Sequence, residues 1–225
     1  MSTFPIPFDE AEAVRYFGAR PEDKEAHGLV NQVFLSVKDE LQPRSIHQLW
    51  HCDIVQGTAE HPGKVQISNG TAFTGTQLAK HLKGCSQLIL LGATLGSRFD
   101  LALRRLSLRS IAEGAAAQAV GTALIETYID EQEKIWKQEL PSYYTYRTRF
   151  SPGYGDWPLE DQRKIFRVLD CAKRIGLTLT EGGLMAPLKS VTAIIGVDTS
   201  GACSEEPEKR GCASCAKTDC AFRRS

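Results

Sequence analysis

The sequence predicts an α+β fold with a mainly antiparallel, twisted sheet and flanking helices. Helix-like and strand-like segments are mixed without the steady strand–helix alternation of a doubly wound domain. Two short strand-like runs, 64–68 and 71–73, are joined by Asn69-Gly70, which is typical of a tight antiparallel turn. With 225 residues, 42% of them hydrophobic, the chain can bury a core without disulfides or metals.

Two helices are expected before the sheet begins. The segment 8–20 has Asp9 to cap its start and Gly18 to stop it. The segment 22–41 carries apolar residues at helical spacing, and Pro43 closes it. These helices form the N-terminal part, 1–42, of the predicted domain.

The predicted core at 43–197 combines strands with helices. Strands are expected at 44–56, 64–68, 71–73, 177–180 and 190–197, and in an apolar run from 85 that enters a glycine-containing turn at 92–96. Helices are expected at 75–83, 98–113, 115–139 and 159–174. The helix at 115–139 starts with small residues, which allow close packing, and ends in charged residues that we expect to be solvated. One domain at 1–197 is therefore predicted, followed by a flexible connector and a Cys-rich tail at 198–225.

Charge balance and patterning argue against some function classes. Lys plus Arg and Asp plus Glu each number 27, whereas nucleic-acid binders usually carry a basic excess. No run approaches the roughly 18 apolar residues of a membrane span. The N-terminus has neither the basic nor the apolar region of a secretory signal. We therefore expect a cytoplasmic protein with no nucleic-acid or membrane partner.

Several partial motifs favour plain structural roles. The G-A-T-L-G at 92–96 lacks the G-x-G-x-x-G pattern and its downstream acidic residue, so a tight packing turn is favoured over a dinucleotide site. His47 and His51 share one face of a strand, and we interpret them as surface or half-buried imidazoles rather than catalytic or zinc-binding groups. No G-x-S-x-G nucleophile elbow occurs.

The stretch RTRFSPGYGDWP at 147–158 predicts a shaped loop, because Pro fixes φ and Gly tolerates unusual backbone conformations. Arg149 offers a planar fork for a carboxylate, and Tyr154 offers a flat face and a hydroxyl. Those parts would hold a zwitterionic amino acid joined to a flat purine. On composition alone a plain turn is the more ordinary interpretation. We expect Arg147, Asp156 and Trp157 to brace the loop.

Four cysteines crowd into the last 23 residues, and two of them form a C-x2-C pair. They are Cys203, Cys212, Cys215 and Cys220. Four thiolates suit zinc or an iron–sulfur cluster, although the spacing matches neither common ferredoxin pattern. In a reducing cytosol such a cluster indicates metal or redox chemistry more than disulfides, and redox-active or free thiols are the alternative to a metal site.

Two further stretches carry a family resemblance. The run from Arg149 to Pro152-Gly153-Tyr154 is followed by a helix and then by LTEGGLMAPLKSV, with Met185 and Pro187 in place. This combination, over about residues 115–197, resembles the activation domain of cobalamin-dependent methionine synthase. The front half and the Cys-rich tail are similar to free-standing relatives of that domain.

The resemblance implies a reactivation function. In that family the R-x-x-x-G-Y loop holds S-adenosylmethionine, which methylates inactive cob(II)alamin while a reduced flavodoxin or ferredoxin supplies an electron. No D-x-H-x-x-G motif is present, so the cobalamin would sit on a partner, either a cobalamin-dependent methionine synthase or another corrinoid protein. The chain would then be a component of a methyltransferase in methionine biosynthesis.

The resemblance also implies site residues for S-adenosylmethionine. Arg149 would bind the carboxylate of its methionine part. The backbone of Ser151, Pro152 and Gly153 would contact the ligand, and Tyr154 would pack near the sulfonium or the adenosine. Two acidic residues are candidates for the positive groups of the ligand, since opposite charges attract over short distances. They are Glu126 and, less directly, Glu181.

Two other functions fit the same residues. A metal- or iron–sulfur-bearing accessory to another corrinoid methyltransferase would use the four C-terminal cysteines to carry an electron. A non-catalytic protein that only senses S-adenosylmethionine would use the loop alone.

Overall fold

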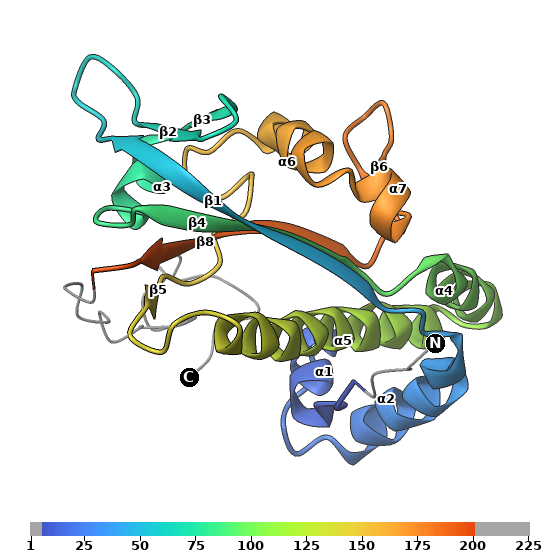
Figure 1. Cartoon of the computed structure of the whole chain (residues 1–225). Coiled ribbons are helices and arrows are strands. Elements are labelled where there is room, and N and C mark those ends of the chain that lie inside the picture. The colour runs from blue at the N-terminus through green and yellow to red at the C-terminus, as the bar shows by residue number, and fades with distance from the viewer. Residues whose placement is uncertain (1–5, 201–225) are drawn as a thin grey trace.

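The computed structural model describes residues 6–200, with a six-stranded antiparallel sheet at the centre (Figure 1). The strand order is β3-β2-β1-β4-β8-β5. These strands are β1 (Arg44–Val55), β2 (Lys64–Ile67), β3 (Ala72–Thr74), β4 (Gln87–Thr94), β5 (Thr145–Tyr146) and β8 (Ser190–Asp198). A separate hairpin joins β6 (Thr178–Leu179) to β7 (Met185–Ala186). The predicted α+β fold with a mainly antiparallel sheet is confirmed.

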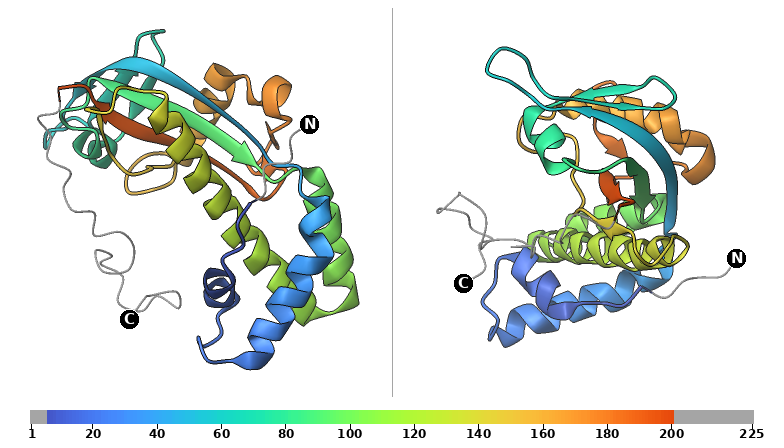
Figure 2. Two further views of the ribbon diagram at one scale, coloured as in Figure 1. Left: turned by 60° about the horizontal axis from the view of Figure 1, so that its bottom comes forward. Right: turned by 60° about the vertical axis from the view of Figure 1, so that its left-hand side comes forward.

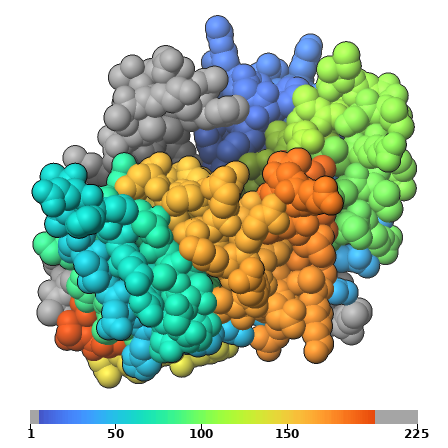
Figure 3. Space-filling view, turned by 90° about the horizontal axis from the view of Figure 1, so that it is seen from above, coloured from blue at the N-terminus to red at the C-terminus, as the bar shows by residue number. Residues whose placement is uncertain are grey.

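Helices cover both faces of the sheet. They are α1 (Glu10–Phe17), α2 (Lys24–Val37), α3 (Thr76–His81), α4 (Ser97–Arg109), α5 (Ile111–Gln138), α6 (Gln162–Leu169) and α7 (Cys171–Ile175), with 3-10 turns at Lys38–Glu40 and Leu159–Asp161. The long α5 runs under the sheet, and α1 and α2 pack on the side of α5 away from it (Figures 1 and 2). Seen from above, α6 and α7 (orange) lie next to the segment that carries β2 and β3 (blue-green) (Figure 3). Within residues 6–200, no helix is long and apolar enough to cross a membrane.

Two apolar clusters result, one on each face of the sheet. Alternate residues of β4 enter different clusters: Ile89 and Leu91 face α5, whereas Leu88 and Leu90 face α6 and α7. Because β4 is a central strand covered on both faces, its sequence is a continuous apolar run instead of an alternating one.

The small residues of α5 serve close packing, as predicted. A Cβ atom added at Gly121 would lie 2.6 Å from the ring of Phe99 and 3.0 Å from the side chain of Lys189. Only glycine therefore fits where α5 crosses α4 and the start of β8.

Three expected boundaries were wrong. The strand β4 continues through Gly92, which pairs with both β1 and β8, instead of turning there. The break between α4 and α5 falls at Ser110, so α5 starts earlier than expected. The helix expected at 159–174 is interrupted at Asp170, whose φ of 51° is left-handed and ends α6 before α7 begins.

Candidate functional site

The segment 145–150 runs along the outer edge of the sheet beside β8. Its first two residues form β5, and farther on the N–H of Phe150 donates to the carbonyl of Ile194 at 2.9 Å. Side chains alternate between faces in extended chain. Arg149 accordingly reaches α5, while Phe150 stacks on Trp157 in the opposite layer with ring centroids 6.1 Å apart. The edge segment therefore places adjacent residues in the two layers of the molecule.

The loop that follows is built on glycine conformations. Gly153 has a φ of 91° and Gly155 a φ of 57°, values that residues with side chains rarely adopt. Three backbone bonds close the loop. The N–H of Gly153 donates to the carbonyl of Trp157 at 2.9 Å, that of Tyr154 to the carbonyl of Ser151 at 3.1 Å, and that of Trp157 to the carbonyl of Tyr154 at 3.0 Å. The loop is thus a set of tight turns with a fixed shape.

Three side chains brace this loop, as predicted. The carboxylate of Asp156 accepts the first two backbone N–H groups of α3, at 2.7 and 2.9 Å. The indole N–H of buried Trp157 donates to Asp161 at 3.0 Å. Arg147 donates to the backbone carbonyl of Lys83 at 3.1 Å. These bonds tie the loop to the start of α3, to the turn that follows α3 and to the 3-10 turn that precedes α6.

Arg149 is bound to three carboxylates of α5. One terminal nitrogen, Nη1, donates to Asp130 at 2.7 Å and also to Glu133. The other, Nη2, donates to Glu126 at 2.9 Å. The three acids are spaced four and three residues apart, which puts them on one face of the helix. Arg149 and Glu126, both predicted for the site, are therefore brought together.

The three acids differ in their surroundings. Glu133 is buried and is also bound to Lys137, whose Nζ lies 3.1 Å from it. The side chains of Glu126 and Asp130 are 42% and 51% exposed. Glu133 is thus held between two cations as part of the packing, whereas Glu126 and Asp130 face solvent.

Burial and charge both act on the cluster. Burial lowers the pKa of Arg149, but the carboxylates of Glu133, Asp130 and Glu126 outweigh it, so the pKa is raised and the guanidinium stays charged. Burial raises the pKa of Glu126, and the nearby Asp130 adds to this, although Arg149 opposes it. The negative charge of Glu126 is therefore disfavoured by burial and favoured by Arg149.

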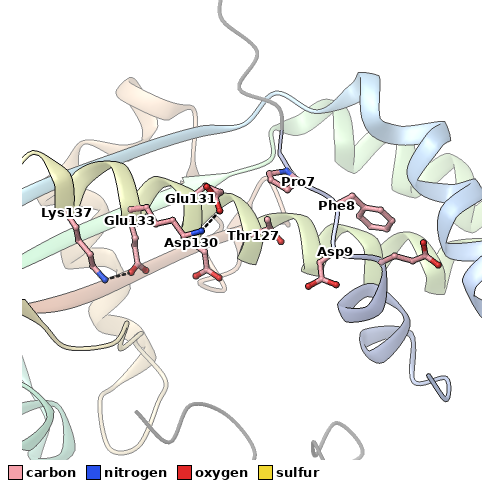
Figure 4. A pocket seen from close by; sticks show the side chains of 10 residues that line it. Pro7, Phe8, Asp9, Thr127, Asp130, Glu131, Glu133 and Lys137 are labelled. Carbon is pink, nitrogen blue, oxygen red and sulfur yellow. Dashed lines mark hydrogen bonds and ion pairs between the residues drawn. The ribbon is translucent and has the colours of Figure 1, made fainter. Parts of the chain in front are cut away.

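A cavity of about 730 Å³ opens beside this cluster. It lies between the segment Pro7 to Glu10 and α5, as Figure 4 shows. Asp130 and Glu133 line it, whereas Arg149 and the loop residues 151–154 do not. The remaining lining residues on α5 are Thr127, Glu131, Lys134 and Lys137. The cavity therefore meets Arg149 through the carboxylates that bind it.

The other predicted residues lie in different places. Tyr154 is 64% exposed, while Pro152 is buried beneath the loop. Glu181 lies at the turn between β6 and β7, where its backbone carbonyl accepts from Arg163 of α6 at 2.7 Å. Since α6 and Arg149's partner α5 cover opposite faces of the sheet, the structure does not bring Glu181 to the cluster.

The predicted metal ligands lie outside the described residues, as does most of the expected connector. They are Cys203, Cys212, Cys215 and Cys220. Between residues 6 and 200, no group of three or more His, Cys, Asp or Glu side chains is placed to hold a metal ion. Zinc or iron–sulfur binding, and the redox function that depends on it, stay predictions.

Two residues of the cluster, Asp130 and Glu133, were not expected from the sequence. Both belong to the charged end of α5, which we expected to be solvated. That expectation holds for Asp130, which is 51% exposed, and is wrong for Glu133, which is buried. The signal that could have found them is their spacing from Glu126, which repeats a helical face.

The comparisons with known proteins match the region that holds this cluster. The family model described as vitamin B12 dependent methionine synthase, activation domain, matches residues 110–202. This part of the chain is similar to that activation domain. The matched residues contain α5, the loop at 147–158 and β8, and so all four members of the Arg149 cluster.

A solved structure shares the fold of this chain. It is the crystal structure of the MetH reactivation domain bound to AdoHcy, with a TM-score of 0.55 and 16% sequence identity. The match covers 76% of this chain and 65% of that one, so the chain spans less than two thirds of its length. No curated protein matches the sequence.

Proposed function

We propose that the chain binds S-adenosylmethionine at Arg149 and supports reductive methylation of cob(II)alamin on a partner, a cobalamin-dependent methionine synthase. One electron from a reduced flavodoxin or ferredoxin and the methyl group of S-adenosylmethionine convert cob(II)alamin to methylcobalamin, and S-adenosylhomocysteine leaves. The cofactors carry this chemistry. The protein contributes by binding the methyl donor and orienting its methyl group toward the cobalt.

One observation carries the proposal. The family match includes both α5 and the loop at 147–158, and the structure joins these two segments at Arg149. The AdoHcy named with the MetH reactivation domain is the demethylated form of the proposed ligand, which supports the same ligand class for this chain.

The residues around Arg149 suit the parts of the ligand. The planar guanidinium can donate two parallel hydrogen bonds to the ligand's carboxylate. Glu126 can accept a hydrogen bond from the ligand's ammonium group or lie near its sulfonium. The exposed ring of Tyr154 offers a flat surface to the adenine. A cavity of about 730 Å³ is lined by Asp130 and Glu133, two of the acids that bind Arg149, and its volume falls within the usual size range of ligand sites.

Calorimetric titration with S-adenosylmethionine tests the first step. We expect binding to the wild-type protein and at least tenfold weaker binding to Arg149→Lys. Lysine keeps a positive charge beside Glu133 but lacks the fork that holds a carboxylate. Arg163→Lys, on α6, is the control and should bind as the wild type does. An absence of binding to the wild type would refute the proposal.

A single-turnover assay tests the second step. The partner synthase would be trapped with cob(II)alamin and mixed with S-adenosylmethionine, reduced flavodoxin and the purified chain. We expect the spectrum of methylcobalamin to form only when the chain is present. Ligand binding without methyl transfer would instead support a protein that only senses S-adenosylmethionine.

A further inference from the structure

The way Arg149 is bound limits how it can take a ligand. A primary guanidinium nitrogen carries two N–H groups, and Nη1 uses both, one on Asp130 and one on Glu133. Nη2 already donates to Glu126 at 2.9 Å. A carboxylate gripped end-on needs one N–H from each of these nitrogens. Nη2 keeps a second N–H, whereas Nη1 has none left, so Asp130 or Glu133 must leave Nη1 before a ligand's carboxylate can bind in this end-on way.

Asp130 is the acid that can leave most easily. Glu133 is buried and forms ion pairs with both Arg149 and Lys137. If it left Arg149, a buried carboxylate would lose one of its two cationic partners. Glu126 does not line the cavity. Asp130 lines it, is the most exposed of the three at 51%, and lies 2.7 Å from Nη1. An exposed ion pair such as this one changes an equilibrium constant by only about two- to fivefold.

We propose that Asp130 is a latch that occupies the place of the ligand's carboxylate on Arg149. In the empty site Asp130 holds the guanidinium in position. On binding, the carboxylate of the ligand replaces that of Asp130, which turns into the cavity. Asp130 is then a positioning residue that lowers affinity, because the ligand must displace it. The inference rests on the proposed function and adds a competitor to the same site.

Charge balance supports displacement. Arg149 and Lys137 bring two positive charges to the cluster, and Glu126, Asp130 and Glu133 bring three negative ones. An additional carboxylate at Arg149 would be repelled by all three acids. Moving Asp130 away restores the number of carboxylates around the guanidinium to three.

Three ligands and two variants test the latch by calorimetry. S-adenosylmethionine and S-adenosylhomocysteine carry the same carboxylate, whereas 5′-methylthioadenosine has none. For Asp130→Asn we expect both carboxylate ligands to bind about three- to tenfold more tightly, by the same factor, because a weak ion pair and a repulsion are both removed. Binding of 5′-methylthioadenosine should be unchanged.

The control is Glu139→Gln, which removes an acid that is 61% exposed at the end of the same helix and has no contact with Arg149. We expect less than a twofold change for all three ligands. Weaker binding by Asp130→Asn would show that Asp130 contacts a positive group of the ligand and would overturn the latch. Equal tightening of 5′-methylthioadenosine would overturn it too.

The two proposals fail in different ways. If the wild type does not bind S-adenosylmethionine, the proposed function fails and the latch with it. If the wild type binds and Arg149→Lys does not, but Asp130→Asn gains no affinity, only the latch fails. Asp130→Ala serves as a second variant, since alanine cannot keep a hydrogen bond to Nη1 as asparagine can.

Discussion

Two cationic side chains, Arg149 and Lys189, lie beside α5 at different points along its length, and they differ in how many carboxylates they bind. Arg149 has three carboxylates around it. Lys189, the residue before β8, donates to the hydroxyl of Thr122 at 2.9 Å and makes no ion pair within the described residues. Burial lowers the pKa of Lys189, whereas the pKa of Arg149 is raised.

Asp100, the acid whose charge acts on Lys189, also lacks a full set of hydrogen-bond partners. One oxygen of Asp100 accepts the backbone N–H of Leu188 at 2.9 Å, and the other is buried without a hydrogen-bond partner. Burial raises the pKa of Asp100. The fold therefore tolerates a lysine with no carboxylate bound to it. The three carboxylates around Arg149 are therefore not explained by a need to neutralise a buried cation. They agree with a binding role for residues 126–133 of α5.

Removing the well-matched cation should have the largest effect on stability. Arg149→Ala would leave buried Glu133 with Lys137 alone and leave Glu126 and Asp130 unpaired. Because the arginine side chain is only 20% exposed, we expect a loss of about 2–4 kcal/mol in the free energy of unfolding. Urea unfolding measures it, and the exposed Arg104→Ala is the control. A loss no larger than that of the control would show that the cluster is not a structural anchor.

Near Lys189, where Gly121 of α5 packs against Phe99, the stability of the fold should depend on close packing. Gly121→Ala would push a methyl group into the ring of Phe99, 2.6 Å away, and we expect a loss of about 1–3 kcal/mol. Gly28→Ala on α2 is the matched control, since nothing lies within 4 Å of its added Cβ. The control should gain up to about 1 kcal/mol from helix propensity. Thermal unfolding of the pair compares them, and equal shifts would contradict the packing explanation.

Neutralising Asp100 should have a smaller effect that depends on pH. Its pKa is raised on folding, so it favours the folded state at low pH, and this contribution is lost as pH rises through the folded pKa. Asp100→Asn should therefore equal or exceed the wild type at pH 7 by less than about 1 kcal/mol, since the site is partly solvated. Unfolding curves at pH 4 and pH 7 test the sign. A marked loss at pH 7 would mean that Asp100 pairs with Lys189 after all.

An exposed ion pair should have the smallest effect. His27 binds Glu10, which lines the cavity. This bond raises the pKa of His27 and lowers that of Glu10. The pair stabilises the fold from above the folded pKa of Glu10 up to the folded pKa of His27, and is lost on either side. His27→Ala should lower the melting temperature slightly at pH 6 and not at pH 9. An equal shift at both values would assign the effect to packing.

Local signals in the sequence predicted much of the fold. Asp9 caps α1 through the N–H of Glu12 at 2.9 Å, and Gly18 ends that helix in a left-handed conformation. The turn at Asn69-Gly70 joins β2 to β3. The features that were missed lack a local signal. β5 has two residues and pairs with the longer β8, and β7 has two residues and pairs with the equally short β6. Asp170 adopts a conformation that usually requires glycine.

The site was predicted in part. Arg149 was named from the chemistry of its loop and from the family resemblance, and Glu126 from the resemblance alone. The structure places Nη2 of Arg149 2.9 Å from Oε2 of Glu126. Their contacts with a ligand stay predictions. Asp130 and Glu133 were missed because charge in a sequence does not distinguish a solvated helix end from one that a distant arginine covers. That arginine is 16 residues beyond Glu133, on another element.

In the edge segment at 145–150, side chains alternate between the two faces of the sheet, so the number of residues before Arg149 decides which face it occupies. Arg149 faces α5 and Phe150 faces Trp157 because they are neighbours in extended chain pinned to β8. Inserting one residue after Tyr146 would exchange the two layers, sending an aromatic ring toward three acids and a guanidinium into an apolar core. Inserting two would keep each side chain on its own face and only slide it along the strand. Changes in length just before the loop are therefore permitted in pairs.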